Sequence, residues 1–235
     1  FVMCEAFSDI SDADVFNYTE TENPLYGYHV VANSPQAVSG HLVISNYGAG
    51  TANSEFDVLT GIQTNMLSDN TSSAFRVVRR NINALPRIYT AAGYNSYFMH
   101  PGISWYYNRS SVYRFLGIDD LVFEEAFADQ EMTGWRISDA AFLQQLITDI
   151  EARTQDSQQP LFAFTVSIEN HQSYMYQKYY YEGPKAELNI PISDEAMEAL
   201  SIYLHGVRTS SDMLHALTEY LDSFAEPTLL VFFGD

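Results

Sequence analysis

The sequence predicts an α/β fold, with a mostly parallel central sheet flanked by helices on both faces. Short apolar runs of the kind seen in buried strands alternate with longer stretches in which apolar residues recur every three or four positions. The chain has 235 residues and no stretch rich in Pro, Gly and Ser that would separate two domains. We therefore expect residues 1–235 to form one domain.

Six apolar runs are candidate strands, and they resemble strands that are buried on both faces. They are Phe1–Cys4, His41–Ser45, Ser96–Met99, Leu121–Phe123, Leu161–Val166 and Thr228–Phe233. Glu5, His100, His171 and Asp235 each follow one of these runs directly or by a few residues. Ligands of open α/β sheets bind outside the carboxyl ends of the strands, so we expect these four side chains to converge there.

Three stretches are candidate helices. They are Asn83–Ala92, Ile137–Ile150 and a long stretch from about Asp194 to Phe224. Gly93 is a good stop for the first, and Ser138 and Asp139 are capping residues near the start of the second. The third is either one helix or two in succession, because Gly206 falls inside its apolar stripe.

The chain is strongly acidic and almost free of cysteine. Eleven Lys and Arg against 30 Asp and Glu give a net charge of −19, which disfavours binding to nucleic acid or to an anionic membrane surface. An anionic substrate remains compatible with this charge, because a metal ion and a few local cations can reverse the field inside one pocket. The single cysteine, Cys4, excludes an internal disulfide and lies in an apolar run, where we expect a buried, inert thiol.

A glycine-rich turn precedes one hydroxyl in the segment Gly48–Phe56. Its sequence, Gly-Ala-Gly-Thr-Ala-Asn-Ser-Glu-Phe, places Thr51 where a helix is expected to start. Glycines allow the backbone to approach a ligand closely, and the amides at a helix start favour negative charge. Thr51 is therefore a candidate nucleophile toward a phosphoryl group, provided that something lowers its pKa. The alternative from these residues alone is that Thr51 only caps the helix.

Several segments, in this order, are similar to those of one enzyme family. They are the opening run ending at Glu5, the turn before Thr51, the segment His100–Arg109, the segment Ser167–His171 and the closing run ending at Asp235. Together they resemble the lipoteichoic acid synthase-like phosphoglycerol transferases of the alkaline phosphatase and sulfatase superfamily. The resemblance covers nearly the whole chain, and its specificity comes from the ordered set rather than from any one motif.

The resemblance implies a metal site formed by Glu5, Asp235 and the alkoxide of Thr51. In the family, a histidine directly after the last aspartate completes the ligand set, and the 235 residues end before that position. Two carboxylates, an alkoxide and an imidazole suit Mn²⁺, with Mg²⁺ and Zn²⁺ as alternatives. Without the resemblance, Glu5 reads as a strand-end carboxylate that faces water.

The resemblance also implies a pocket for the phosphoglycerol group. His100 and Arg109 fall on the family's histidine and arginine, and Tyr107 stands where relatives often have tryptophan, a place that nearby Trp105 could take instead. Gly102 replaces an aspartate found in some relatives, which leaves the contacts to the glycerol hydroxyls open. The alternative for Arg109 is a surface arginine at a helix start.

His171 matches a family histidine that contacts the phosphoryl group or protonates the leaving alkoxide. A lone histidine more often forms a structural hydrogen bond, and only the resemblance favours the catalytic role. The activity implied is metal-dependent transfer of glycerol phosphate from a phosphatidylglycerol-type lipid to a polymer or glycan acceptor, with a covalent intermediate on Thr51.

Four other functions compete with this one. Phosphoethanolamine transfer and phosphodiester hydrolysis use the same nucleophile and metal, although typical ethanolamine transferases carry several disulfides that this chain lacks. Sulfatases mature a Cys or Ser in a Cys/Ser-x-Pro-x-Arg context, whereas this chain reads Thr51-Ala-Asn-Ser-Glu55. A noncatalytic binding domain would usually have lost a metal ligand or the nucleophile, and Glu5, Thr51 and Asp235 are all present.

The sequence contains neither a signal peptide nor an apolar run of the roughly 18 residues that span a membrane. Family members carry transmembrane helices before the catalytic domain. We therefore expect the chain to be a domain truncated at both ends, from a protein anchored in a bacterial membrane with its catalytic part on the extracytoplasmic face.

Overall fold

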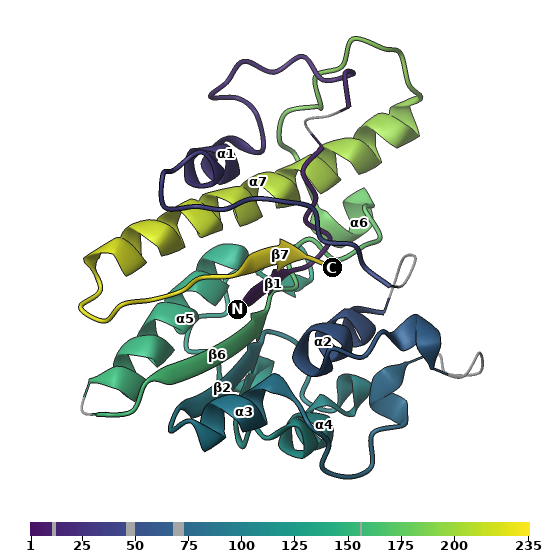
Figure 1. The fold of residues 1–235 in the computed structure, drawn as a ribbon. Helices are drawn as coiled ribbons and strands as arrows, with labels where there is room; N and C mark the ends of the chain where they lie inside the picture. Colours follow the sequence, from purple (N-terminus) through teal and green to yellow (C-terminus); the bar gives the residue numbers. More distant parts are fainter. Residues whose placement is uncertain (11–12, 46–49, 68–72, 156) are drawn as a thin grey trace.

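The computed structural model describes residues 1–10, 13–45, 50–67, 73–155 and 157–235, and its centre is a five-stranded parallel sheet (Figure 1). The strand order is β3-β2-β6-β1-β7, and each neighbouring pair is parallel. The strands are β1 (Val2–Cys4), β2 (Asn95–His100), β3 (Asp120–Phe123), β6 (Leu161–Val166) and β7 (Phe232–Gly234). Because all five run the same way, their carboxyl ends lie at one edge of the sheet.

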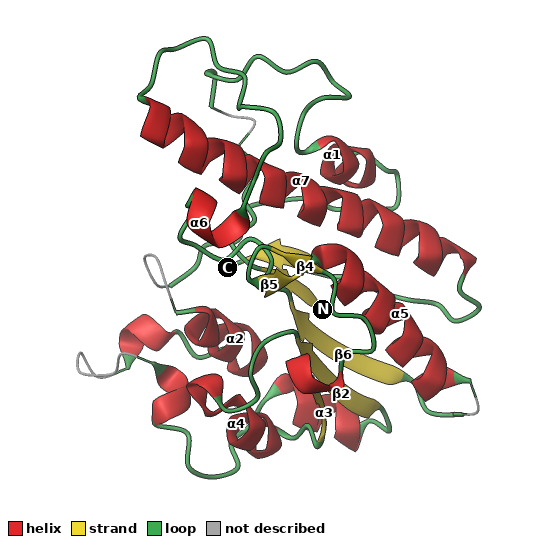
Figure 2. Ribbon diagram, turned by 180° about the vertical axis from the view of Figure 1, so that it is seen from behind, coloured by secondary structure: helices red, strands yellow, loops and turns green. Residues whose placement is uncertain are grey.

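Helices cover both faces of the sheet, as predicted (Figures 1 and 2). The first face carries α2 (Thr51–Thr60), α3 (Leu85–Ala91) and α4 (Arg109–Leu116). Their apolar side chains share one core with strand residues such as Met3 and Phe98. The second face carries α1 (Tyr26–Ala32), α5 (Asp139–Thr154) and α7 (Asp194–Ser223). Their core includes Val2, Cys4 and Met99, so the thiol of Cys4 is buried as expected. The predicted α/β class is confirmed.

Short elements complete the fold near the carboxyl ends of the strands. They are a two-stranded antiparallel hairpin of β4 (Met132–Thr133) and β5 (Arg136–Ile137), the helix α6 (Tyr176–Tyr179) and four 3₁₀ turns at Thr64–Met66, Ala74–Arg76, Tyr106–Asn108 and Glu124–Ala126. Figure 2 shows the hairpin and α6 on the same side of the molecule. Contact between them is direct, because a Cβ added to Gly134 in the hairpin turn would lie 2.2 Å from the carbonyl oxygen of Lys178.

One predicted strand is wrong and another is shorter than expected. Residues 41–45 are not a strand, and Val43 is 89% exposed. An apolar run becomes a strand only where another strand pairs with it, and residues 41–45 pair with none of the described strands. At the end of the chain, the predicted run Thr228–Phe233 contributes only Phe232–Gly234 to the sheet, beside β1.

The predicted helices are present with adjusted bounds. The stretch Asn83–Ala92 contains the shorter α3, with Pro86 in its first turn, and Ile137–Ile150 becomes α5, which starts after Ser138. The long stretch is a single helix, α7. Gly206 does not interrupt it but makes room for a neighbour, because a Cβ there would lie 2.1 Å from Asn170 Oδ1.

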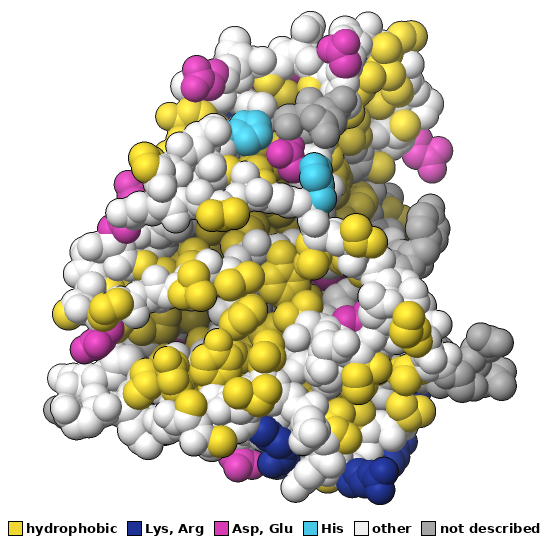
Figure 3. Space-filling model, viewed as in Figure 1, with side chains coloured by type: hydrophobic (Ala, Val, Ile, Leu, Met, Phe, Trp, Pro, Cys, Tyr) yellow, Lys and Arg dark blue, Asp and Glu magenta, His cyan; other side chains and the backbone are white. Residues whose placement is uncertain are grey.

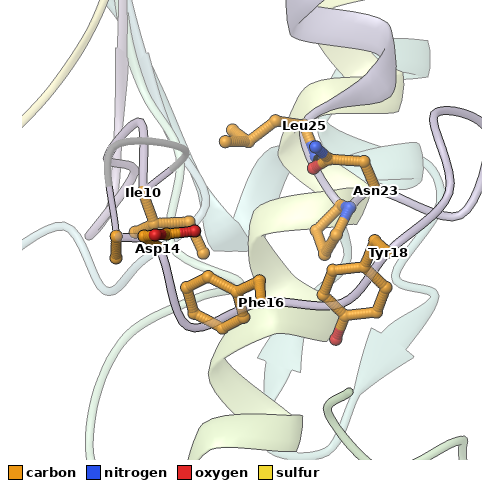
Figure 4. Close-up of a pocket in the computed structure, with 8 residues that line it drawn as sticks. Ile10, Asp14, Phe16, Tyr18, Asn23 and Leu25 are labelled. Carbon is orange, nitrogen blue, oxygen red and sulfur yellow. Dashed lines mark hydrogen bonds between the residues drawn. The ribbon is translucent and has the colours of Figure 1, made fainter. Parts of the chain in front are cut away.

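Two cavities lie outside the region where the candidate site residues were expected. A cavity of about 570 Å³ with a mixed polar and apolar lining lies among residues at the beginnings of β1 and β6, the ends of α5 and α7 and the segment before β7. Figure 3 shows apolar side chains gathered around a hollow on this side of the molecule. A smaller cavity of about 140 Å³ lies among Ile10, Phe16, Tyr18 and Leu25 in the N-terminal segment (Figure 4). None of the helices in the described ranges is both long and apolar enough to cross a bilayer.

Candidate active site

Two carboxylates lie side by side at the carboxyl ends of β1 and β7. Cys4 pairs with Gly234 in the sheet, so the residues that follow, Glu5 and Asp235, are neighbours although the chain separates them by almost its full length. The backbone amide of Ala6 donates a hydrogen bond to Asp235 Oδ1 at 2.8 Å, which ties the two strand ends together. The predicted convergence of these two acids is therefore present.

Thr51 joins this pair from the start of α2. Gly50 precedes the helix with φ of 99°, a left-handed conformation that glycine adopts without strain. The Thr51 hydroxyl donates to Glu5 Oε2 at 3.4 Å, and Thr51 is 8% exposed. Gly48 and Ala49, the first half of the predicted turn, lie outside the described residues.

Among the described residues, no side chain caps the start of α2. Asn53, the third residue of α2, accepts a hydrogen bond from the Ala74 amide at 2.8 Å through its side chain. This bond holds the 3₁₀ turn Ala74–Arg76 against the start of the helix. Thr51 does not act as the N-cap, because it is the first helical residue and Gly50 holds the cap position. This excludes the alternative in which Thr51 only caps the helix.

Burial and charge repulsion raise the pKa of Glu5. Loss of solvation, followed by the negative charge of Asp235, raises the pKa of Glu5 from 4.5 to about 8. Arg109, the Thr51 hydroxyl and Arg136 act in the opposite direction. A buried carboxylate repelled by a half-buried one is an arrangement that a divalent cation relieves.

Arg109 is buried rather than on the surface, and a carboxylate already pairs with it. It is 2% exposed, and its Nε and Nη2 donate to Glu55, which is fully buried on the second turn of α2. The Nη2–Oε1 distance is 2.5 Å, and Tyr113 donates its hydroxyl to Glu55 Oε2 at 2.6 Å. Glu55 thus compensates the charge of Arg109 and joins α2 to α4.

His100 is neutral and fixed in one orientation at the end of β2. Its Nδ1 lies 3.0 Å from the carbonyl oxygen of Val166, which can only accept, so Nδ1 carries the proton. Burial, followed by the charge of Arg109, holds the pKa of His100 well below its usual range. A Cβ added to Gly102 would lie 2.5 Å from His100 Nε2. Glycine at 102 therefore lets the chain pass directly beside this imidazole, where an aspartate would displace it.

His171 lies on the loop after β6 and is also bound through Nδ1. That atom donates to the carbonyl oxygen of Gln172 at 2.5 Å. Burial lowers the pKa of His171, and the charges of Arg136 and Lys178 add to this effect. Lys178, from α6, donates to the carbonyl oxygens of His171 and Gln172. It therefore holds the loop that carries His171.

The two aromatic candidates differ in their surroundings. Tyr107 is half-buried with φ of 54°, and the Arg109 guanidinium carbon lies 5.2 Å from the centre of its ring. Trp105 is 70% exposed and contacts Tyr106 edge to face. Tyr107 is thus the aromatic ring beside the arginine, while Trp105 projects into solvent.

Three charged residues of this region were missed by the sequence analysis. Glu55 lies within the segment singled out for Thr51, but only the fold brings it to Arg109. Arg136 and Lys178 come from the hairpin and α6, two short elements without a periodic sequence signal. Arg136 acts electrostatically on Glu5, His100, His171 and Lys178, which places it in the same region.

The residues present fit a divalent cation, although the described part of the chain does not hold a cluster of three or more His, Cys, Asp or Glu side chains. What it brings together is two carboxylates, Glu5 and Asp235, with the Thr51 hydroxyl beside one of them. Hard oxygen donors of this kind suit Mn²⁺ or Mg²⁺ and also occur around Zn²⁺.

Comparisons with known proteins place the chain among relatives. A curated relative from Rhizobium meliloti (strain 1021), named "Putative cyclic beta-1,2-glucan modification protein", is 28% identical over 196 residues, which are 83% of this chain and 30% of the relative. The chain thus spans less than a third of that protein's length.

Two solved structures share the fold. The Streptococcus pyogenes phosphoglycerol transferase GacH, in complex with sn-glycerol-1-phosphate, matches with a TM-score of 0.81 and 23% identity over 100% of this chain and 59% of its own. The lipoteichoic acid synthase LtaP from Listeria monocytogenes matches with a TM-score of 0.70 and 18% identity over 94% of this chain and 51% of its own. The family model of the sulfatases matches residues 1–235, and the chain belongs to the sulfatase family.

Proposed function

We propose that this domain transfers glycerol phosphate from a phosphatidylglycerol-type lipid to a polymer or glycan acceptor, through a covalent intermediate on Thr51. The observation that carries the proposal is the position of the Thr51 hydroxyl, 3.4 Å from Glu5 Oε2, beside the strand end that bears Asp235. A hydroxyl at an uncapped helix start, next to two carboxylates able to hold a cation, is suited to attack on phosphorus.

In the first step, Thr51 Oγ1 attacks the phosphorus of the lipid phosphodiester. A new P–O bond forms to Thr51 and the P–O bond to diacylglycerol breaks, while the proton that Thr51 loses balances the one that the departing diacylglycerol oxygen takes up. Glu5 and Asp235 would hold a divalent cation, most suitably Mn²⁺, that lowers the pKa of the Thr51 hydroxyl and offsets charge on a phosphoryl oxygen. His100, Tyr107 and Arg109 would line the pocket for the glycerol phosphate unit, with Trp105 at its exposed rim.

In the second step, an acceptor hydroxyl attacks the phosphorus of the glycerophospho-threonine. A P–O bond to the acceptor forms, the P–O bond to Thr51 breaks, and the Thr51 oxygen takes up a proton equivalent to the one that the acceptor loses. Because the pKa of His171 is lowered and its Nδ1 holds a proton for Gln172, the neutral ring offers Nε2 as an acceptor. His171 is therefore better suited to accept the proton of the incoming hydroxyl in this step than to donate one from a charged ring at rest.

The relatives support both the transferred group, glycerol phosphate, and the class of acceptor, a glycan. A structural neighbour is a phosphoglycerol transferase in complex with sn-glycerol-1-phosphate, and another is a lipoteichoic acid synthase. The curated relative is named for modification of a cyclic glucan, which supports a glycan as the acceptor class. We place the reaction on the extracytoplasmic face of a bacterial membrane, where a lipid donor and an envelope glycan meet, with the whole protein anchored in that membrane. Nucleic acid is not among the proposed partners.

The test is a comparison of Thr51→Ala with Thr60→Ala, a variant at the other end of the same helix. Thr60 donates to the carbonyl oxygen of Phe56 and lies away from the nucleophile. We expect Thr51→Ala to lose turnover of phosphatidylglycerol by at least about 10³-fold while still folding, because the attacking atom is removed. Thr60→Ala should retain its turnover. Diacylglycerol release by Thr51→Ala at the rate of the unsubstituted protein would rule out the mechanism.

Mass spectrometry of the trapped intermediate separates the proposal from its rivals. A glycerophosphate adduct on Thr51 is expected, whereas a phosphoethanolamine adduct would identify the other transferase activity. Rapid hydrolysis without transfer to a glycan would indicate a phosphodiesterase. Failure to bind Mn²⁺ and to form any adduct would favour a noncatalytic binding domain.

A further inference from the structure

Most cationic groups of the site are already neutral or engaged. The charge of Arg109 is compensated by Glu55. His100 and His171 both have lowered pKa values, and each uses its Nδ1 proton on a backbone carbonyl. Lys178 donates to two carbonyls of the loop that it supports. Arg109, His100 and His171 therefore supply no uncompensated positive charge for an anionic substrate. Lys178 keeps its charge, but two of its three donors are used on the loop.

Arg136 differs from all of them. Its Nε is buried and without a hydrogen-bond partner among the described residues, and neither an ion pair nor a side-chain hydrogen bond joins Arg136 to any of them. Buried donors are normally paired, so an unpaired one calls for a ligand or another explanation. The positive charge of Arg136 also acts on Glu5, His100 and His171, so it lies within electrostatic range of all three.

The backbone around Arg136 is held firmly on both sides. Thr133 pairs with Arg136 across the hairpin, Ile137 is buried, and the amide of Ser138 donates to the carbonyl oxygen of Glu131 at 2.8 Å. The hairpin turn packs against α6 at Gly134, whose φ of 60° and close approach to Lys178 exclude a side chain. Arg136 is therefore presented from a fixed position.

We propose that Arg136 is the residue whose guanidinium binds the phosphoryl oxygens of the glycerol phosphate unit, and that it determines the preference of this site for an anionic group. The inference rests on the proposed function and extends it to a residue outside the family-like motifs. A guanidinium presents a planar set of donors that matches two phosphate oxygens, which a lysine cannot reproduce. The buried and unpaired Nε is then satisfied when the substrate binds.

The experiment measures binding of sn-glycerol 1-phosphate by calorimetry, with Mn²⁺ present, to the unsubstituted protein, Arg136→Gln, Arg136→Lys and Arg114→Gln. Arg114 is the matched control, because it is exposed on α4 and donates to the Ser110 carbonyl of its own helix. We expect Arg136→Gln to weaken binding about tenfold or more, Arg136→Lys to weaken it less, and Arg114→Gln to leave it unchanged. Free glycerol, which has no charge, should bind all four equally.

Stability provides the second measurement. Arg136→Gln removes an unpaired buried donor, so its melting temperature should stay level or rise while affinity for glycerol phosphate falls. Unchanged affinity in Arg136→Gln, or a lowered melting temperature with an affinity loss shared by Arg114→Gln, would overturn the inference. A different result tests the proposed function: if the unsubstituted protein fails to bind glycerol phosphate and forms no adduct on Thr51, that function itself is wrong.

Discussion

The helices α2 and α5 both begin near the carboxyl ends of the strands, yet their first turns are built in opposite ways. At α5, the Ser138 hydroxyl accepts from the Ala141 amide at 3.1 Å, and Glu169 accepts from the Asp139 amide. At α2, Gly50 offers no side chain, and the helix start has no side-chain cap. Side chains thus satisfy two amides at the start of α5, whereas at the start of α2 the described residues provide no side-chain cap, and the Asn53 amide donates to the carbonyl oxygen of Gly50.

This difference indicates that α2, which lacks a side-chain cap among the described residues, is held in place by contacts farther along the helix. The first turn of α2 gains little from capping, and its second turn carries Glu55, which binds Arg109 and Tyr113 in the core. In α5, the support lies in the first turn itself, where Ser210 donates to Asp139 Oδ2 at 2.6 Å. The protein therefore separates the group that does chemistry, Thr51, from the group that holds the helix in place.

The largest effect is expected for Glu55→Gln. This change leaves the Arg109 guanidinium buried without a counter-charge, which lowers the free energy of unfolding by about 3–5 kcal/mol. The double variant Glu55→Met with Arg109→Met removes both charges and should recover much of that loss, since an apolar pair of similar size avoids the unpaired ion. Urea unfolding measures both. If Glu55→Gln lowered the free energy of unfolding by less than about 1 kcal/mol, the pair of Glu55 and Arg109 would not be what anchors α2.

The next effect concerns the acid at the start of α5. Burial, followed by the nearby charge of Glu169, raises the pKa of Asp139 well above its ordinary 3.8. Because the folded state holds this proton more tightly than the unfolded state does, the stabilisation is complete below the ordinary pKa and declines as pH rises toward the raised one. Asp139→Asn keeps the side chain neutral at every pH. The free energy of unfolding of this variant, relative to that of the unsubstituted protein, should therefore be higher at pH 8 than at pH 5.

Unfolding free energies at the two pH values check this expectation. Asp222→Asn is the control, because Asp222 is exposed on α7. The same change there should leave the dependence of the unfolding free energy on pH as it is in the unsubstituted protein. If the unfolding free energies of Asp139→Asn and the unsubstituted protein changed equally with pH, Asp139 would not hold its proton more tightly in the folded state.

Sequence patterns predicted the elements whose signal is local. The parallel sheet and the Ser138 cap follow from apolar runs and turn residues, and the common edge of parallel strands accounts for Glu5 lying beside Asp235. The place of Thr51 beside them was implied only by the resemblance to the phosphoglycerol transferases. Residues 41–45 show the limit of such patterns, because an apolar run does not reveal whether a partner strand exists. The assignment of metal and substrate roles to these residues stays a prediction.

Contacts between distant residues could not be predicted in this way. Glu55 and Arg109 are 54 positions apart, and only the packing of α2 against α4 makes one of them the counter-ion of the other. Arg136 owes its position to the hairpin and to α6, two elements too short for a periodic pattern. The charge balance of the site is therefore a property of the fold rather than of any motif.

The smallest and sharpest test compares Gly50→Ala with Ser138→Ala at the two helix starts. Gly50 has φ of 99°, so a side chain there introduces strain of about 1–2 kcal/mol, and it also shifts the turn that positions Thr51. Ser138→Ala removes one capping bond, which lowers the free energy of unfolding by about 1 kcal/mol. Both variants should therefore lose similar stability, but only Gly50→Ala should slow formation of the adduct on Thr51. Urea unfolding and adduct mass spectrometry on the same samples measure the two effects, and equal adduct rates in both variants would mean that the open start of α2 has no special part in the reaction.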